Sequence, residues 1–524
     1  MALTYKQSVL VRGSIPALRE HGETIATLFY SNMLRGHPEL KVLFNTANQA
    51  TGRQPRALTS VILAFAANLH HTSELIPRLE RVCNKHCSLG IHPEHYDVVG
   101  KYLLQAFAQV LGPAAWTPDL HAAWSRAYSV LARMLSGREA QLYRQFAADT
   151  ATPHASTAHD PDAAAWTGWR PFTVDKRVDE AAGMVSFYLY PVDGRRLPLF
   201  RPGQYVSLRV QVPELDNQPQ LRQYALSEAP RPEYYRITVK RDMGRLAAAA
   251  AAARGGSSAA AGGAGGKGGA RASSIVNSGA RGGDVRKFRP GVVSNLLLDE
   301  KWPGDAVELS HPAGDFWVDE DALEAGRSLP LVLLSAGIGA APLMAMFNGS
   351  VTAVSPVPSR AGTPSSGGAS VRERPISWVH WSAPSSSSSS PSSSSGLASP
   401  GGRRGTDGTD GTAPFQEHVR RVARERTQTA AHFFRSRVAE MDDLEAGKEE
   451  TERELMALRM DLASLAEAPG RPLHLDHGAA LYYVCGTEAF MEEAGRFLAE
   501  RRVDRARVKF EWFTTGDPAE KVVV

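Results

Sequence analysis

The apolar residues of this 524-residue chain change their spacing twice, and each change restricts the fold. Over residues 1–150 they recur at helical intervals, for example from Leu58 to Leu69. Over residues 165–325 they alternate along short segments such as Val206–Val212, which is typical of strands in an antiparallel β-barrel. Over residues 326–524, strand, glycine turn and helix recur, which favours a parallel α/β sheet. We therefore expect three domains of different class.

Composition excludes several classes of protein. The formal charge of +4 is too small to indicate a nucleic-acid-binding protein. The three cysteines, Cys83, Cys87 and Cys485, are too few for a disulfide framework and fit a reducing compartment. Lys6 and Arg12 interrupt the first apolar residues, so we expect no secretory signal and a cytoplasmic location.

One apolar stretch, residues 329–347, is long enough to suggest a membrane span. Two prolines and two glycines interrupt it. A buried strand, a glycine turn and a helix explain these interruptions better, so we expect no membrane span.

Three stretches have the composition of flexible insertions. Residues 246–288 are rich in Ala, Gly and Ser, residues 349–375 in Ser, Pro and Gly, and residues 382–413 contain serine runs. Such segments have too little apolar content to form a core, so we expect disorder. Their protein partners, if any, are not evident from the sequence.

Polar residues stand at unexpected places in the helical region. Gln54 lies four residues before Leu58 and so on the same helical face, and Glu139 continues the apolar series of Leu131 and Leu135. A buried carboxylate is costly unless it is hydrogen-bonded, so these positions suggest a functional pocket.

A second group of polar residues follows in Cys83, His86 and Cys87. They could form part of a metal cluster, although structural zinc sites need a fourth ligand and usually a CxxC spacing.

Gln54, His86 and Glu139 belong to a larger pattern that resembles the globin domain of flavohaemoglobins, the nitric oxide dioxygenases. The pattern comprises Phe29-Tyr30, Pro38-Glu39-Leu40, Phe44-Asn45, Asn48-Gln49, Gln54 with Ala57-Leu58, Lys85-His86, Tyr96 and Arg138-Glu139-Ala140. It covers nearly the whole of residues 1–150 with almost no gaps.

The resemblance implies a haem b pocket with His86 as the iron ligand. It implies roles for six further residues: hydrogen bonding behind the imidazole for Tyr96 and Glu139, hydrogen-bond donors on the ligand side for Tyr30 and Gln54, and packing on the haem for Phe44 and Leu58. A carboxylate on the far imidazole nitrogen raises the basicity of the ligand, which favours oxygen activation over storage.

The second domain contains motifs that resemble the FAD-binding barrel of the ferredoxin-reductase superfamily. They are Arg201–Tyr205, Arg222–Leu226 and Gly291–Asn295. The residues implied in FAD binding are Tyr205, Arg222, Gln223, Tyr224, Ala225, Val293 and Ser294. Ala225 stands where the superfamily usually has Ser, which would remove one hydrogen bond worth ~1 kcal/mol.

The third domain resembles the pyridine-nucleotide domain of the same superfamily. A GxGxxP turn follows the apolar strand, and its glycines would let the backbone approach a pyrophosphate at a helix N-terminus. The implied NAD(P)H contacts are Gly337, Gly339, Pro342, Cys485 and Gly486. The closing strand implies that Phe513 covers the flavin face and that Trp512, Thr514 and Thr515 also take part in cofactor binding. The chain departs from the usual pattern at Ala341, where Thr is expected, and at Thr514-Thr515, where Gly-Pro is expected.

Together these features predict an NAD(P)H-dependent nitric oxide dioxygenase, in which FAD relays electrons to haem and nitric oxide and dioxygen are the substrates. Two alternatives stay open: an oxygen- or nitric-oxide-sensing globin with a weak reductase, and a general NAD(P)H-dependent reductase. The sequence does not decide between NADH and NADPH, nor does it give the oligomeric state.

Overall fold

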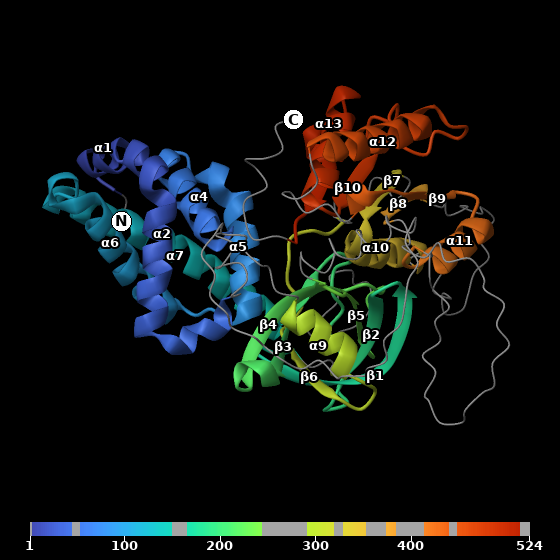
Figure 1. Ribbon diagram of the computed structural model, residues 1–524, viewed down its shortest axis with the longest axis horizontal. Coiled ribbons are helices and arrows are strands. Elements are labelled where there is room, and N and C mark those ends of the chain that lie inside the picture. The colour runs from blue at the N-terminus through green and yellow to red at the C-terminus, as the bar shows by residue number, and fades with distance from the viewer. Residues whose placement is uncertain are drawn as a thin grey trace, which may run out of the picture.

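The computed structural model shows a helical domain, a β-barrel and an α/β domain (Figure 1). It describes residues 3–44, 53–148, 165–243, 291–318, 329–352, 374–383, 413–439 and 448–513. This order of fold classes confirms the predicted one.

The helical domain is built from α-helices and two short 3₁₀ segments. These are α1 (Tyr5–Gly13), α2 (Ile15–Gly36), η1 (Pro38–Leu43), α4 (Arg53–Ala67), η2 (Thr72–Leu75), α5 (Ile76–Leu89), α6 (Pro93–Ala115) and α7 (Pro118–Ala148). Helix α2 packs on α4 and α6, and α5 packs on α7. Phe29, Phe65 and Phe107 fill the core between them.

Local signals set the ends of helix α5. Proline stands in its first turn, where the missing N–H has no helical partner to lose. Gly90 ends the helix in the left-handed conformation, with φ 75°. Helix α5 lies on the side of the helical domain that faces the barrel (Figure 1).

The barrel is a six-stranded antiparallel sheet. Its strands are β1 (Arg170–Ala181), β2 (Met184–Pro191), β3 (Tyr205–Val212), β4 (Gln218–Ala225), β5 (Tyr235–Lys240) and β6 (Ala306–Leu309), in the order β4-β3-β6-β1-β2-β5. A bridge between Leu226 and Ile237 brings the two edges together. The short segment η3 (Pro213–Leu215) joins β3 to β4, and α9 (Val292–Glu300) packs on the barrel core through residues such as Leu297.

The third domain is a five-stranded parallel sheet in the order β11-β10-β7-β8-β9. Its strands are β7 (Leu331–Ala336), β8 (Ile376–Ser382), β9 (Thr429–Arg435), β10 (Leu481–Cys485) and β11 (Val508–Glu511). Its helices are η5 (Gly337–Gly339), α10 (Ala340–Thr352), α11 (Gln416–Glu425), η6 (Arg437–Ala439), α12 (Lys448–Glu467), α13 (Glu488–Glu500) and η7 (Arg505–Arg507).

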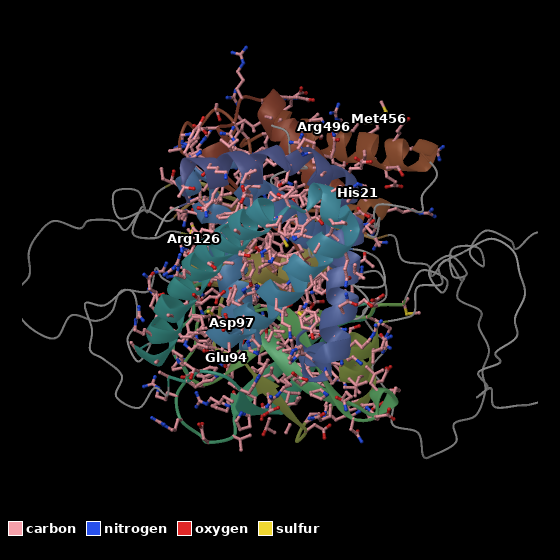
Figure 2. The ribbon with its side chains drawn as sticks, turned by 90° about the vertical axis from the view of Figure 1, so that its left-hand side faces the viewer. His21, Glu94, Asp97, Arg126, Met456 and Arg496 are labelled. Carbon is pink, nitrogen blue, oxygen red and sulfur yellow. The ribbon has the colours of Figure 1, made fainter. Side chains whose placement is uncertain are left out.

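Helices cover both faces of this sheet because side chains alternate along β7. Leu331 and Leu333 pack with α10 and α11, whereas Val332 and Leu334 pack with α12 and α13. Figure 2 shows α12 along the top of this domain, where Met456 is 65% exposed.

Residues 329–347 form a strand, a turn and a helix, as expected for a globular domain. No helix in the described part of the chain is both long and apolar enough to cross a membrane. Helix α10 continues to Thr352, so the first four residues of the expected insertion 349–375 are helical. The reason is that Val351 still packs against the core there. The expected insertion 246–288, and nearly all of 349–375 and 382–413, lie outside the described residues.

Candidate functional site

The side chains of His86, Tyr96 and Glu139 come from three helices and form one hydrogen-bonded group. Nδ1 of His86, on α5, lies 2.8 Å from Oε1 of Glu139 on α7 and 3.0 Å from the hydroxyl of Tyr96 on α6. The Tyr96 hydroxyl donates to the same Glu139 oxygen over 2.6 Å. The structure therefore brings together the three residues that the sequence predicted on this side of the haem.

The arrangement determines which imidazole nitrogen is available to a metal. A carboxylate only accepts hydrogen bonds, and the Tyr96 proton is already donated, so Nδ1 of His86 carries the proton. Nε2 is then left with its lone pair, which is the form of histidine that binds a metal. The side chain of His86 is 31% exposed, so a ligand can reach it.

Burial reinforces this network. Glu139 is 2% exposed, and its second oxygen, Oε2, has no hydrogen-bond partner in the described part of the chain. Burial and the neighbouring Glu139 carboxylate together raise the pKa of Tyr96, so the phenol keeps its proton and acts as a donor.

The two cysteines beside His86 do not form a metal site with it. The thiol of Cys83 donates to the carbonyl of Leu135, and that of Cys87 donates to the carbonyl of Glu139, both over 3.7 Å. Burial raises the pKa of Cys87 to about 12. Among the described residues no group of three His, Cys, Asp or Glu side chains could hold a metal ion.

A second polar group joins α2 and α4. Tyr30 is 9% exposed and hydrogen-bonded to Gln54, and burial raises the pKa of its phenol. Oε1 of Gln54 is buried and has no partner among the described residues. The ring of Phe44 lies 5.5 Å from that of Tyr30, and Leu58 packs on the same core. The structure thus brings together Tyr30, Gln54 and Phe44 and places Leu58 in the core of the same domain.

These two groups fit a haem. Nε2 of His86 offers a metal ligand, and the unpaired Oε1 of Gln54 is a buried polar atom that requires a partner. The residues present are those that a haem with a small polar ligand would need: one imidazole, neutral donors and apolar walls.

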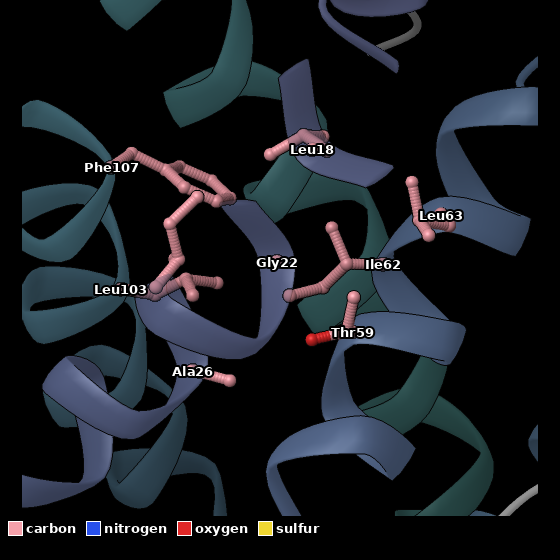
Figure 3. Close-up of a pocket in the computed structure, with 9 residues that line it drawn as sticks. Leu18, Gly22, Ala26, Thr59, Ile62, Leu63, Leu103 and Phe107 are labelled. Carbon is pink, nitrogen blue, oxygen red and sulfur yellow. The ribbon is translucent and has the colours of Figure 1, made fainter. Parts of the chain in front are cut away.

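The same helices enclose an apolar cavity that the sequence did not lead us to expect. Figure 3 shows Leu103 and Phe107 of α6 on one side of it and Ile62 of α4 on the other. The pocket is small and partly open, with about 10 Å³ of space for the centre of a water molecule. At Gly22 a Cβ would lie 2.3 Å from Thr59, so the absence of a side chain permits the close approach of α2 and α4. Small residues on one face of α2 were the sequence signal.

The predicted flavin residues lie together on strands β3 and β4. Tyr224 packs on the barrel core, and burial lowers the pKa of Arg222. Ala225 is the register partner of Tyr205, which packs against the core of the helical domain. The amide of Gln223 donates to Ser207 over 3.1 Å, so its side chain is directed to the neighbouring strand.

The predicted phosphate turn precedes helix α9. In the described part of the chain Gly291 caps this helix without a side-chain hydrogen bond, and the N-terminus of a helix favours an anion. The hydroxyl of Ser294 donates to the Gly291 carbonyl over 3.4 Å. The side chain of Val293 is buried in the barrel core, so only its backbone can face a phosphate.

The predicted nucleotide residues meet at the carboxyl ends of β7 and β10. A Cβ at Gly339 would lie 2.1 Å from the Cys485 carbonyl and 2.7 Å from the Gly486 amide, so the two loops touch. Gly337 has φ 54°, and Pro342 is in the first turn of α10. This edge of a parallel sheet is where nucleotides bind.

The predicted cofactor-binding residues of the closing segment follow strand β11, and Phe513 is the one predicted to cover the flavin. Trp512 packs on the core of the third domain, and Phe513 is 48% exposed. Thr514 and Thr515 lie outside the described residues.

A charged junction of all three domains was also missed by the sequence reasoning. Arg81 of α5 contacts the Phe510 carbonyl at 3.4 Å and Asp315 at 3.6 Å. Burial raises the pKa of Glu511 to about 8, although Arg81 and Lys85 oppose this rise. The sequence signal was a charged residue inside each of two motifs, Lys85 before His86 and Glu511 in the last strand.

Comparisons with known proteins agree with the order of these domains. A family model described as Globin matches residues 27–135. A flavohemoprotein of Bordetella parapertussis is 34% identical over 511 residues, which are 97% of this chain and 98% of the relative. A flavohemoprotein of Chromobacterium violaceum is 40% identical over 340 residues, covering 64% of this chain and 69% of the relative. The solved flavohemoglobin of Malassezia yamatoensis, with bound FAD and heme, aligns with a TM-score of 0.62 at 22% identity, covering 98% of this chain and 100% of that one.

Proposed function

The chain belongs to the flavohaemoglobin family of flavohemoproteins, and on that premise we propose that it is a nitric oxide dioxygenase, which converts nitric oxide and dioxygen to nitrate. Family membership makes it an oxidoreductase with haem, FAD and NAD(P)H as cofactors. The specific activity on nitric oxide is the proposal.

One observation carries the proposal: the carboxylate of Glu139 accepts a hydrogen bond from Nδ1 of His86 over 2.8 Å. A carboxylate in this place increases the electron density that the imidazole gives to a metal, which favours reaction of dioxygen over its reversible storage. Tyr96 holds the carboxylate in position through its 2.6 Å hydrogen bond.

When bound, haem and FAD would supply the redox chemistry, with NAD(P)H as the source of electrons. The residues of the chain bind and orient. His86 presents Nε2 because Nδ1 is occupied. Tyr30 keeps its proton because burial raises its pKa, so it remains a hydrogen-bond donor at neutral pH.

The reductase part supports the proposal through its own geometry. The touching loops of Gly339 and Cys485 form a nucleotide site at the edge of the third domain. Tyr205 of the barrel packs on the helical domain, so the candidate flavin strands lie against the domain of His86. Charge balance requires one electron for each nitrate formed from nitric oxide and dioxygen.

The test is anaerobic reduction of the purified full-length protein by NADH or NADPH, followed by addition of dioxygen and nitric oxide with nitrate measured. We expect reduction of flavin and then haem, and nitrate in proportion to nitric oxide consumed. The variant His86→Ala should retain FAD, lose haem and form no nitrate.

Three outcomes would overturn the proposal. A haem that stays oxidised while the flavin is reduced would indicate a sensing globin. Nitric oxide consumption without nitrate, or the same main activity in His86→Ala, would indicate a different electron acceptor.

A further inference from the structure

Helix α5 contacts the rest of the helical domain on one face and the reductase part on another. His86 faces Tyr96 and Glu139, whereas Arg81, Asn84 and Ser88 lie on a face of the helix turned roughly 140° away or more. That second face contacts the reductase part: the Gly314 amide donates to Oδ1 of Asn84 over 3.0 Å in a buried contact. The helix that carries the predicted iron ligand is therefore also the docking helix.

A directed chain of hydrogen bonds crosses this interface. The side-chain amide of Gln223 donates to Oγ of Ser207 over 3.1 Å, Ser207 donates to Oγ of Ser88 over 2.9 Å, and Ser88 donates to the carbonyl of Lys85 over 2.8 Å. The Ser207 hydroxyl accepts one bond and donates one, and the Ser88 hydroxyl is also hydrogen-bonded to Tyr205. The chain begins between Arg222 and Tyr224 of the flavin motif and ends on the peptide bond that joins Lys85 to His86.

The two serines in the middle of this hydrogen-bond chain are buried. Ser207 is 0% exposed and Ser88 is 1% exposed, so water cannot replace a missing partner. The backbone N–H of Ser207 donates to Oγ of Ser310 over 2.9 Å, which helps to fix the position of Ser207 in the sheet. Hydrogen bonds in series strengthen one another in a buried setting, and loss of one hydroxyl leaves its donor unpaired.

We propose that Ser207 and Ser88 are positioning residues for electron transfer from FAD to haem, because they fix helix α5, and with it His86, on the flavin-binding strands. Each transfer moves one electron to the haem iron and oxidises the flavin by one electron, with NAD(P)H as the source. The inference rests on FAD-to-haem electron transfer and not on nitric oxide as substrate.

The test uses the full-length protein with its cofactors and the variants Ser207→Ala, Ser88→Ala and the double variant. Anaerobic stopped-flow mixing with NADH or NADPH follows flavin reduction and haem reduction separately. We expect haem reduction to slow by on the order of tenfold, within the hundredfold that a 1 Å misplacement can cost. Flavin reduction should stay within about twofold, since the nucleotide site is elsewhere. The double variant should match the slower single variant, because the two hydroxyls act as one unit.

The matched control is Ser186→Ala. Ser186 and Thr238 form another buried hydroxyl pair of the same barrel, 2.9 Å apart on β2 and β5. This variant loses one buried hydroxyl but no contact with the helical domain, so it should leave haem reduction unchanged.

A second readout is independent of activity. Amide hydrogen exchange in the segment 79–89, measured with and without cofactors, should rise in Ser207→Ala and Ser88→Ala and not in Ser186→Ala. The carbon monoxide spectrum of the reduced haem should be unchanged, because His86 keeps its own partners.

The proposal is overturned if haem reduction is unchanged in both single variants, if flavin reduction slows equally, or if Ser186→Ala has the same effect. Should Ser207→Ala fail to fold, Ser88→Ala decides the question from the other side of the interface. No nitric oxide is present, so failure of the proposed dioxygenase activity would not affect this result.

Discussion

At the scale of single residues, the environment of His86 depends on one charge. Glu139 is 2% exposed and accepts hydrogen bonds from both His86 and Tyr96 through one oxygen. A buried carboxylate persists only when such partners stabilise it. The carboxylate therefore has two consequences: it fixes the imidazole tautomer, and it increases the electron density on the ligand.

The variant Glu139→Gln separates these two consequences. The amide oxygen can still accept from Nδ1 of His86, so haem should bind, but the charge is lost. We expect nitric oxide consumption to fall by about 10-fold or more and the iron–histidine stretching band in the Raman spectrum to move to lower frequency. Tyr96→Phe, which removes one hydrogen bond of ~1 kcal/mol, should shift the band less. An unchanged band in Glu139→Gln would contradict this role.

A second residue makes stability depend on pH. Burial raises the pKa of Glu511 from 4.5 to about 8. Between these values the folded chain holds a proton that the unfolded chain releases, so this contribution to stability is complete below pH 4.5 and is lost as the pH rises through about 8.

The variant Glu511→Gln should remove this dependence. Urea unfolding of both proteins between pH 5 and pH 9 measures it. As the pH rises, we expect the free energy of unfolding of the variant to increase relative to that of the natural chain. The difference should be at most about 5 kcal/mol, and less if water reaches the junction. A difference in unfolding free energy that stays constant with pH would show that Glu511 is ionised throughout.

At the scale of elements, the position of His86 depends on where helix α5 ends. Gly90 adopts φ 75° at this end, a conformation that costs residues other than glycine about 1 kcal/mol. Gly137 lies inside helix α7 with open space around it and ordinary helical geometry. Replacement by alanine should therefore have opposite effects on the free energy of unfolding at these two positions.

Gly90→Ala should lower the free energy of unfolding by about 1 kcal/mol, whereas Gly137→Ala should raise it by about 0.5–1 kcal/mol. Urea unfolding of the helical domain, followed by the haem absorbance, measures both. Equal effects of the two substitutions would show that backbone conformation does not limit the end of α5.

The nucleotide site depends on contact between two loops. A Cβ at Gly339 would lie 2.1 Å from the Cys485 carbonyl, far inside any van der Waals contact. We expect Gly339→Ala to force the loops apart and to raise the KM for NAD(P)H by about tenfold or more, while FAD and haem contents stay normal. Normal kinetics with NAD(P)H would place the nucleotide elsewhere.

At the scale of the whole molecule, three domains act as one unit because α5 contacts both of the others. Arg81 reaches the carbonyl of Phe510 in the third domain, and Asn84 reaches Gly314 beside the barrel. The expected insertions lie outside these contacts in the sequence. Loop-closure entropy grows slowly with length, so such segments can change without disturbing the domains.

Deletion of residues 384–412 should therefore leave nitric oxide consumption within about twofold of the natural chain and the free energy of unfolding within about 1 kcal/mol. Nitrate formation and urea unfolding measure the two quantities. Loss of activity with normal haem and FAD contents would show that this serine-rich segment takes part in function.

Apolar spacing along the chain was enough to predict the class of each domain, because it shows which faces of an element are buried. The alternation of Val206, Leu208 and Val210 predicted strand β3, and all three are buried. The glycine turn predicted the strand, turn and helix within residues 329–347, although the helix continues to Thr352. Motif resemblance also selected His86, Tyr96 and Glu139, which the structure brings together; their roles, and the domain boundaries, stay predictions.

The contacts between the domains could not be predicted from the sequence and became visible in the folded chain. Ser88 and Ser207 are unremarkable in sequence, since a serine that pairs across an interface has no periodicity or motif to mark it. Glu511 lies inside a recognisable motif, but its raised pKa results from burial that the sequence does not show. Spacing along a chain records which side of an element is apolar, but contacts between distant elements depend on packing, which forms only when the whole chain has folded.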